Sequence, residues 1–433
     1  MAPQPRTGHR FTPVKPLNVS LRQPHKVYMQ AVQGANGVSM SMFEGIKVID
    51  LTQALSGPFA STMLADQGAE VIKVEVPKIG DNSRAWGPPF VNGVSSYFLS
   101  VNRNKKSITL NLKDERAKEI FFKLVREADV LLENFRPGVT ERLGIDYENV
   151  HKVNPRIVYA SISGFGQTGP YKKRPGYDQV IQGMGGLMSI TGEESGPPVK
   201  VGLPITDIAS GMYAAFGVAG ALYKRQLTGM GDYIDVSMLD CQVSWLTFQA
   251  GRYFATGEVA EKMGSAHPTI VPYQAFKTKD IYINIAAGSD KLWQAMCDVL
   301  GKPEWKDDPL MKTNDDRVKN RAQVVPLIEG VLITRPGDEW AHDLMEAGVP
   351  CGHIYTIDRV LTDEHVLFRD MVQEFEHPVI GKFKHTGIPV KVKEEPGSLR
   401  IPPPLLGEHT KEILDELGYT EEEQTVFEEE DVI

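Results

Sequence analysis

The feature that most constrains the fold is an alternation of short β-branched runs with helical periodicity between residues 46 and 163. The runs are IKVID (46–50), EVIKVE (70–75), SITLNL (107–112), DVLLEN (129–134) and RIVYASIS (156–163). Helices are expected between them, from about Pro58 to Asp66 and from about 114 to 127. Because parallel strands need long crossovers, this pattern predicts an α/β fold with a mostly parallel, doubly wound sheet and a ligand crevice at the carboxyl ends of its strands.

The chain beyond residue 230 predicts a second, smaller region. A strand at 232–238 precedes a hairpin over 273–288, helical segments reach about residue 340, and β-type runs return at 377–392. The predicted organisation is a disordered arm or targeting segment at 1–43, the first part of a large Rossmann-like domain at 44–235, an inserted smaller α+β domain with linkers at 236–345, and a return to the large domain with an acidic C-terminal tail at 346–433.

Residues 1–43 contain no Asp or Glu but five Lys or Arg and five Pro. A lack of acids is typical of organelle-targeting segments, whereas prolines disfavour the amphipathic helix that such segments form. A cytoplasmic location is therefore the expectation, and the mitochondrial matrix is the alternative if this segment is a targeting signal.

The charge distribution favours a small-molecule partner. Residues 408–433 carry eleven acids and one Lys, which contributes −10 to the formal net charge of −9, so the rest of the chain sums to about +1. No basic field argues for nucleic acid, and no run of roughly 18 consecutive apolar residues predicts a membrane span. Cys241, Cys297 and Cys351 are widely spaced, which argues against a disulfide framework or structural zinc.

Several familiar catalytic motifs are missing from the sequence. The first βα turn reads LTQALSGPFAS, without a G-x-G-x-x-G dinucleotide fingerprint, and no phosphate loop of the G-x-x-x-x-G-K-[ST] type occurs. No G-x-S-x-G elbow or H-E-x-x-H pair occurs either, which excludes the usual hydrolase and zincin templates.

The most informative segment is VGLPITDIASGMYAAFGVAGALY (201–223), in which Asp207 opens a helix rich in small residues. One interpretation is structural, because an aspartate there caps the first-turn amides. The other is catalytic: a carboxylate kept ionised by the helix dipole and backbone donors is a competent nucleophile toward an activated acyl group. Gly211, Gly217 and Gly220 predict close approach of another segment.

Eight segments stand in a defined order between Gly45 and Thr410: GIKVIDLTQALSGPFASTMLADQGAEVIKVE, GDNSRAWGPPF, NRNKKSI, ADVLLENFRPG, NPRIVYASISGFGQTGP, the loop to Asp207 followed by IASGMYAAFG, TGMGDYIDVSML, and PPPLLGEHT. Together they resemble the class III CoA-transferases, the family of formyl-CoA, carnitine and succinyl-CoA-dependent dicarboxylate transferases. The resemblance implies a large Rossmann-like domain, a small domain, and a homodimer of two interlocked chains.

The resemblance also implies the site. Asp207 matches the family's catalytic aspartate, and two charged positions, Lys113 and Arg142, suit phosphate, although both also fit as solvated surface charges. The full set of implied coenzyme A contacts is Leu55, Ser56, Lys113, Asn134, Phe135, Arg136, Arg142, Tyr177 and Asp178.

The implied reaction is ping-pong transfer of CoA through an aspartyl-CoA thioester, with an acyl-CoA and a small carboxylic acid as substrates and no cofactor beyond CoA itself. The stretch AHPTIVPYQAFKTKD (266–280) is similar to the succinyl-CoA-dependent members and favours a dicarboxylate acceptor, with His267 as a candidate for its distal carboxylate. The stretch 262–273 is expected to cover the site, although it has only Gly264 where the family has a glycine-rich loop.

Two other functions are open to a chain of this kind. An α-methylacyl-CoA racemase would share the fold but needs a His-Asp pair where this chain has Tyr177 and Asp178. A non-catalytic acyl-CoA-binding protein is the second alternative, and the presence of Asp207 speaks against it.

Overall fold

The computed structural model describes residues 40–433. Most of the segment predicted as an arm, residues 1–43, therefore lies outside the described residues. At its end, the Phe43 amide donates to the carbonyl of Gln67 at 2.9 Å, and the Phe43 side chain packs against the core. Phe43 thus anchors the chain to the core close to the point where the sequence pattern changes.

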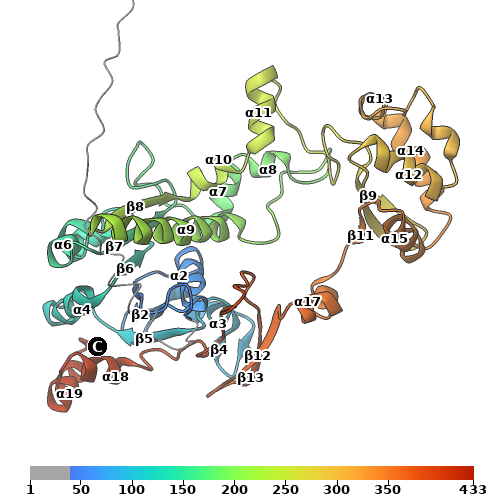
Figure 1. The fold of residues 1–433 in the computed structure, drawn as a ribbon. Helices are drawn as coiled ribbons and strands as arrows, with labels where there is room; N and C mark the ends of the chain where they lie inside the picture. The colour runs from blue at the N-terminus through green and yellow to red at the C-terminus, as the bar shows by residue number, and fades with distance from the viewer. Residues whose placement is uncertain (1–39) are drawn as a thin grey trace, which may run out of the picture. The chain divides into compact units, whose positions relative to one another are not determined.

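A six-stranded sheet, parallel throughout, forms the centre of the large region (Figure 1). Its order is β5-β2-β1-β6-β7-β8. The strands are β1 (Lys47–Asp50), β2 (Glu70–Glu75), β5 (Lys105–Thr109), β6 (Val130–Glu133), β7 (Val158–Ser163) and β8 (Asp232–Ser237). This confirms the parallel sheet, and the order is that of a Rossmann-type fold, in which ligands bind where the strand order reverses, here between β1 and β6.

Helices cover both faces of this sheet. Successive strand residues point to opposite sides, and the apolar side chains on each side are buried under a separate set of helices. Ile49 belongs to the core under α4, whereas its neighbour Val48 belongs to the core under α9. The elements on the first face are α4 (Glu115–Glu127), α6 (Tyr147–Val153) and α18 (Thr410–Glu416), and those on the second are α2 (Ser56–Asp66) and α9 (Ile205–Thr228). Through α18 the chain therefore packs on the large sheet again near residue 410.

Helix α9 packs closely on α2 through a glycine. A Cβ built on Gly211 would lie 2.6 Å from the carbonyl oxygen of Ser56, so only glycine permits this contact. Gly217 is also tight, with Ile234 3.2 Å from such a Cβ, whereas Gly220 has open space. Within residues 40–433, α9 is the helix long and apolar enough to span a membrane, and half of that stretch is buried in the fold.

The middle of the chain forms a separate three-stranded antiparallel sheet, β11-β10-β9, with its own core around Phe276, Trp293 and Trp340. The predicted hairpin is present as β9 (Tyr273–Lys277) and β10 (Tyr282–Ala286). The third strand, β11 (Cys351–His353), extends this core beyond the predicted boundary at residue 345. The helices of this region are α12 (Asp290–Val299), η2 (Pro303–Lys306), α13 (Asn314–Lys319), α14 (Arg321–Leu332) and α15 (Gly337–Glu346).

The remaining elements connect or flank these two sheets. Between β2 and β5 lie η1 (Asn82–Ala85), β3 (Phe90–Val91), β4 (Val94–Ser95) and α3 (Ser96–Ser100). Between β6 and α6 lies α5 (Val139–Leu143), between β7 and α9 lie α7 (Asp178–Met184) and α8 (Leu187–Ile190), and after β8 follow α10 (Met238–Ser244) and α11 (Thr247–Thr256). After β11 the chain forms α16 (Ile357–Val360), α17 (Glu364–Phe368), the hairpin β12 (Val372–His377) and β13 (Gly381–Thr386), and finally α19 (Glu421–Glu429).

A buried network of charges lies where β1, β2 and β5 adjoin. The Lys105 ammonium is fully buried and lies 3.1 Å from Asp50 Oδ2, 2.9 Å from Asn102 Oδ1 and 3.0 Å from the carbonyls of Pro58 and Val101. Burial works against the ionised form of Asp50, but the nearby lysines and hydroxyl donors outweigh it and hold the pKa of Asp50 below its usual range. The ammonium of Lys105 is thus the counter-charge that lets Asp50 remain ionised in the interior.

Lys105→Met should destabilise the fold by about 3 kcal/mol, because it leaves a buried carboxylate without its ion-pair partner. The neighbouring Lys106 is the matched control: its partners Glu70 and Glu412 are exposed, so Lys106→Met should cost less than about 1 kcal/mol. Urea unfolding of both variants against the parent measures the difference. Equal losses in the two variants would contradict the assignment of the stabilisation to the buried pair.

Candidate active site

A cavity of about 330 Å³ opens at the switch point between β1 and β6. The chain leaving β1 supplies Gln53, Ala54 and Ser56 to its wall, and the chain leaving β6 supplies residues 134–137. Asp207, from the start of α9, also lines it. The cavity therefore lies where the doubly wound topology predicts a ligand, and it contains Asp207, the candidate catalytic acid of the sequence analysis.

Asp207 is not the N-cap of α9, and that prediction was wrong. The helix begins at Ile205, with Pro204 at the N-cap position, so Asp207 lies inside the first turn. Its main-chain oxygen accepts from Ser210 Oγ at 3.0 Å, but its carboxylate receives no hydrogen bond within the part of the chain that the structure describes. The expectation that backbone donors hold this carboxylate ionised was therefore also wrong.

Asp178 makes the capping contacts instead, from a different helix. Its Oδ1 accepts from the Thr206 amide at 2.9 Å and from the Thr206 hydroxyl at 2.7 Å. Its Oδ2 accepts from Gln182 Nε2 at 2.6 Å. Because Thr206 directly precedes Asp207, these bonds fix the start of α9 and with it the position of Asp207.

The electrostatic surroundings of Asp207 favour its neutral form. Burial, followed by the charge of Asp178, raises the pKa of Asp207 to about 7. Tyr97 lies close enough to respond to the same charges: burial, together with Asp207 and Asp178, raises the pKa of Tyr97 to about 12. Asp207 is thus a carboxyl without a cation partner among the described residues, poised to change its ionisation near neutral pH.

The structure brings together part of the implied coenzyme A contacts. Those that line the cavity with Asp207 are Ser56, Asn134, Phe135, Arg136 and Tyr177. Asn134 also braces the first loop, accepting from the Gln53 amide at 2.8 Å and donating to the Gln53 carbonyl at 2.8 Å.

The other four predicted contacts lie outside the cavity wall. Leu55 precedes α2 and is buried, and Asp178 is bonded to Thr206 beside the cavity. Lys113 and Arg142 do not line the cavity, so their contact with coenzyme A stays a prediction.

Sequence reasoning missed several residues of the cavity wall. Trp86 and Tyr97 line it, and their rings meet edge to face at a centroid distance of 4.9 Å. Ser163 lines it too, and its hydroxyl is buried without a hydrogen-bond partner in residues 40–433. Lys172 and Arg174 add two exposed cations. Trp86 lies in the segment GDNSRAWGPPF and Ser163 at the end of β7, so the sequence offered a signal for both, whereas no motif marks Tyr97.

His267 does not line the cavity of Asp207 within this chain. Its ring stacks on Phe248 at 5.4 Å and lies 5.2 Å from Tyr273, and its Nδ1 accepts from the Thr269 amide. No described histidine lines the cavity, and residues 40–433 hold no cluster of three or more His, Cys, Asp or Glu suited to a metal ion. The wall formed by these residues therefore lacks the His-Asp pair that racemase chemistry requires.

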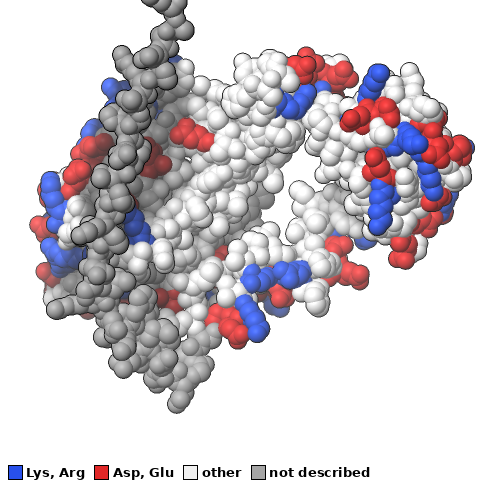
Figure 2. Space-filling model, turned by 45° about the horizontal axis from the view of Figure 1, so that its top comes forward, with Lys and Arg blue, Asp and Glu red and all other residues white. Residues whose placement is uncertain are grey.

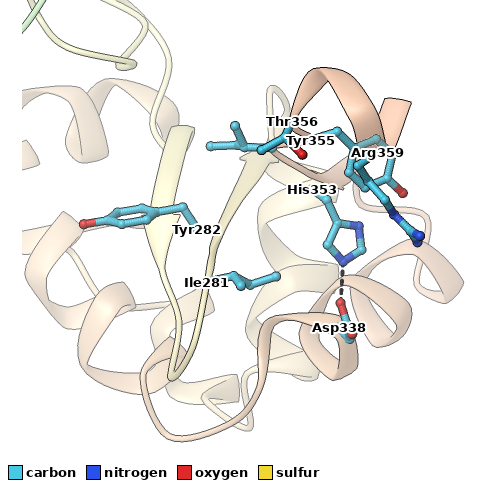
Figure 3. Close-up of a pocket in the computed structure, with 8 residues that line it drawn as sticks. Ile281, Tyr282, Asp338, His353, Tyr355, Thr356 and Arg359 are labelled. Atoms are coloured by element: carbon cyan, nitrogen blue, oxygen red, sulfur yellow. Dashed lines mark hydrogen bonds and ion pairs between the residues drawn. The ribbon is translucent and has the colours of Figure 1, made fainter. Parts of the chain in front are cut away.

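A larger hollow, of about 780 Å³, lies in the middle region against β10 and β11. His353 Nε2 and Asp338 Oδ1 lie 2.7 Å apart at its edge, and Tyr355 stacks on His353 (Figure 3). The side chain of Asp338 is 84% exposed and already paired. Size alone does not make an active site, and the smaller cavity is the better candidate because it contains a half-buried carboxyl that has no partner among the described residues.

The fold and the site together define an α/β enzyme with a free carboxyl in a ligand crevice. The chain matches the model of CoA-transferase family III over residues 43–410 and belongs to this family of CoA-transferases. The resemblance read from the sequence is thereby confirmed.

Individual relatives agree with this assignment. The chain is 44% identical over 379 residues to succinyl-CoA:glutarate CoA-transferase of Mus musculus, and the aligned region covers 88% of this chain and 87% of the mouse protein. It is 42% identical over 366 residues to acetyl-CoA:oxalate CoA-transferase of Acetobacter aceti, covering 83% and 92% of the two chains. A crystal structure of a CAIB/BAIF family protein from Brucella suis superposes with a TM-score of 0.78 at 39% identity, covering 88% of this chain and 100% of that one.

The stability of the Asp207→Asn protein relative to the wild type should increase as the pH rises. The folded pKa of about 7 lies above the unfolded value of 3.8, so the wild-type carboxyl is neutral in both states at low pH and costs the folded state progressively more between those values. After discounting for partial exposure, we expect the advantage of the Asn variant to grow by about 2 kcal/mol between about pH 4 and about pH 8.

Denaturant unfolding at the two pH values measures this growth. Asp240→Asn, an exposed aspartate in the first turn of α10, is the control and should show no comparable growth. A capping role for Asp207 predicts the opposite sign, because loss of the carboxylate would then destabilise the protein most at high pH.

Proposed function

We propose that this CoA-transferase moves CoA from succinyl-CoA to a small dicarboxylic acid, with Asp207 as the nucleophile. The observation that carries the proposal is the half-buried carboxyl of Asp207, unpaired in the described chain, at the switch point of a Rossmann-type sheet. The relatives support the substrates, since curated proteins of Mus musculus, Homo sapiens and Agrobacterium fabrum that resemble this chain are succinate or succinyl-CoA:glutarate CoA-transferases.

The first half-reaction transfers CoA to the enzyme. The ionised carboxylate of Asp207 attacks the thioester carbonyl of succinyl-CoA, forming a mixed anhydride and releasing the CoA thiolate. The thiolate then attacks the aspartyl carbonyl of that anhydride. The aspartyl-CoA thioester forms and succinate leaves as the carboxylate, so no proton or electron is left unbalanced.

The second half-reaction reverses these steps with the new acid. A carboxylate of the acceptor attacks the aspartyl thioester, which gives a second mixed anhydride and again frees the thiolate. The thiolate attacks the acyl carbonyl of the acceptor, the new acyl-CoA forms, and Asp207 returns as a carboxylate. The raised pKa of Asp207 fits this role, because a more basic carboxylate is the better nucleophile once it is ionised.

The cavity wall offers groups for the other demands of this chemistry. The backbone amides in the first turn of α2 at Ser56 are donors for developing oxyanions. Arg136, Lys172 and Arg174 are cations suited to the phosphates of coenzyme A and to the distal carboxylate of the acceptor. The cover needed to exclude water is assigned to residues 262–273, which in this chain lie outside the cavity wall.

Incubation of the protein with succinyl-CoA and no acceptor should leave a fraction of the chain heavier by CoA minus water. Hydroxylamine should convert the modified residue to a hydroxamate, and peptide mapping should locate it at Asp207. Asp207→Asn is nearly isosteric and, since it caps nothing, should remain folded while transfer to glutarate falls at least about 1,000-fold.

The decisive outcome is the mapped residue. An adduct on Cys241, Cys297 or Cys351 would replace the aspartyl mechanism with a thiol one. Solvent deuterium at the α-carbon of a 2-methylacyl-CoA, with neither adduct nor transfer, would favour the racemase alternative, and tight CoA binding without any turnover would favour the non-catalytic one.

We further propose that the protein is a homodimer, as interlocked members of the family are, and that α9 contributes to the interface. Four large apolar side chains form a stripe on the outer side of α9, with exposures of 48% for Met212, 77% for Phe216, 70% for Tyr223 and 67% for Leu227. Few charged side chains lie on this face (Figure 2). An exposed apolar stripe of this size is typical of a surface covered by a second copy.

Light scattering after gel filtration should therefore give the mass of two chains for the wild-type protein. Phe216→Asp combined with Tyr223→Asp should shift the protein to a monomer or to aggregates, because it places charges in the apolar interface. Lys224→Ala on the same helix removes an exposed ion pair with Asp232 and should leave the dimer intact. A soluble wild-type monomer at high concentration would refute the dimer.

A further inference from the structure

Glu133 is a buried acid directly beneath the cavity wall that the reaction scheme does not use. It ends β6, and only 3% of its surface is exposed. Its Oε2 accepts from the amide of Phe135 at 2.8 Å, which shapes the turn that leaves the strand. Its Oε1 is hydrogen-bonded to the hydroxyl of Ser161 on the neighbouring strand β7.

These bonds tie together two separate parts of the cavity wall. The turn after Glu133 supplies residues 134–137, and the chain after Ser161 supplies residues 162–165. Gln167 extends the link, since its Nε2 donates to Ser161 Oγ at 2.6 Å and its amide donates to Asp235 Oδ2 at 2.9 Å. A change at Glu133 is therefore passed directly to both segments.

The described charges with the largest effect on the pKa of Glu133 are both negative, Glu141 on α5 and Asp235 on β8. Tyr159 on β7 and Tyr233 on β8 also lie close enough to respond to its charge. Burial, only partly offset by the bonds from Ser161 and Phe135, raises the pKa of Glu133 to about 7. This contrasts with the ionised Asp50, whose charge is matched by lysines. The neutral acid is the form that this environment accommodates without strain.

We propose that Glu133 is a positioning residue for the acyl-CoA: as the neutral acid it holds residues 134–137 and 162–165 in the binding geometry, and its ionisation weakens acyl-CoA binding. The neutral acid donates its proton to Ser161 Oγ and still accepts from the Phe135 amide. An uncompensated carboxylate there would draw in water, displace the wall, and repel the phosphates of the incoming ligand. The inference rests on the CoA binding that the proposed function requires.

The test measures binding of acetyl-CoA to the Asp207→Asn protein by calorimetry, so that neither turnover nor the titration of Asp207 interferes. In this background Glu133→Gln mimics the neutral acid. At about pH 6 the two proteins should bind equally, whereas at about pH 8 only about a tenth of Glu133 is neutral and the Glu133→Gln protein should bind about tenfold more tightly. Because the two proteins are compared at the same pH, the effect of the ligand's own phosphate titration on the affinity is the same for both.

Glu141→Gln in the same background is the matched control. It removes one nearby negative charge from an exposed side chain that makes no contact with Ser161 or Phe135 in the hydrogen bonds described above. It should keep the pH dependence of the parent, with the midpoint moved slightly to lower pH because the charge of Glu141 contributes to the raised pKa of Glu133. If Glu133 had a merely structural role, Glu133→Gln would lower the affinity for acetyl-CoA by the same factor at both pH values. The Glu133→Gln protein would then not be the tighter binder at about pH 8.

A second measurement does not depend on the variant. At about pH 8 the ligand's phosphates are already fully ionised, so binding of acetyl-CoA in two buffers of different ionisation enthalpy should show uptake of close to one proton. The same pH dependence of affinity with and without Glu133→Gln, or binding without proton uptake, would overturn the inference while leaving the transferase assignment intact. Failure to bind acetyl-CoA at any pH would instead remove the proposed function itself.

Discussion

The active-site geometry depends on buried ion pairs at the ends of β1 and β2. Lys73 lies 2.9 Å from Asp81 and donates to the carbonyl of Thr52 at 2.6 Å, and the side chains of Lys73 and Asp81 are fully buried. Asp81 in turn accepts from the amide of Ala54 at 3.0 Å, which holds Ala54 at a φ of 67°. Because leaving a buried charge unpaired is costly, these bonds stabilise the arrangement of the loop after β1 that presents Ser56 to the cavity.

The acids around the cavity have different roles because their partners differ. Asp50 is matched by lysines and stays ionised, so it is structural. Asp178 is held by hydrogen bonds from Thr206 and Gln182, which use up its oxygens. Asp207 has neither a cation nor a donor among the described residues, and its carboxylate is therefore the one left available to attack a thioester.

The sequence predicts most of the sheet, because apolar runs and their spacing are local signals, but it misplaces the start of β5. The predicted strand begins at Ser107 and leaves out Lys105, whose charge is buried against an acid from another strand. The same limit applies to the site. Asp207 could be singled out from its position near a helix start and from the family resemblance, but the cap comes from Asp178 on another helix. Trp86 directly follows η1 and Tyr97 lies in the short helix α3, and only the folded chain brings both rings to the cavity of Asp207.

Helix α9 connects the chemistry to the proposed dimer. Its first turn carries Asp207, Gly211 holds it against Ser56 at the start of α2, and its outer stripe begins at Met212, within two turns of the nucleophile. A second copy covering that stripe would remove water from the surroundings of Asp207. Less water favours the neutral carboxyl at rest and protects the mixed anhydrides from hydrolysis once they form. In the mechanism proposed here, dimerisation is thus part of the catalytic environment as well as of the stability of the fold.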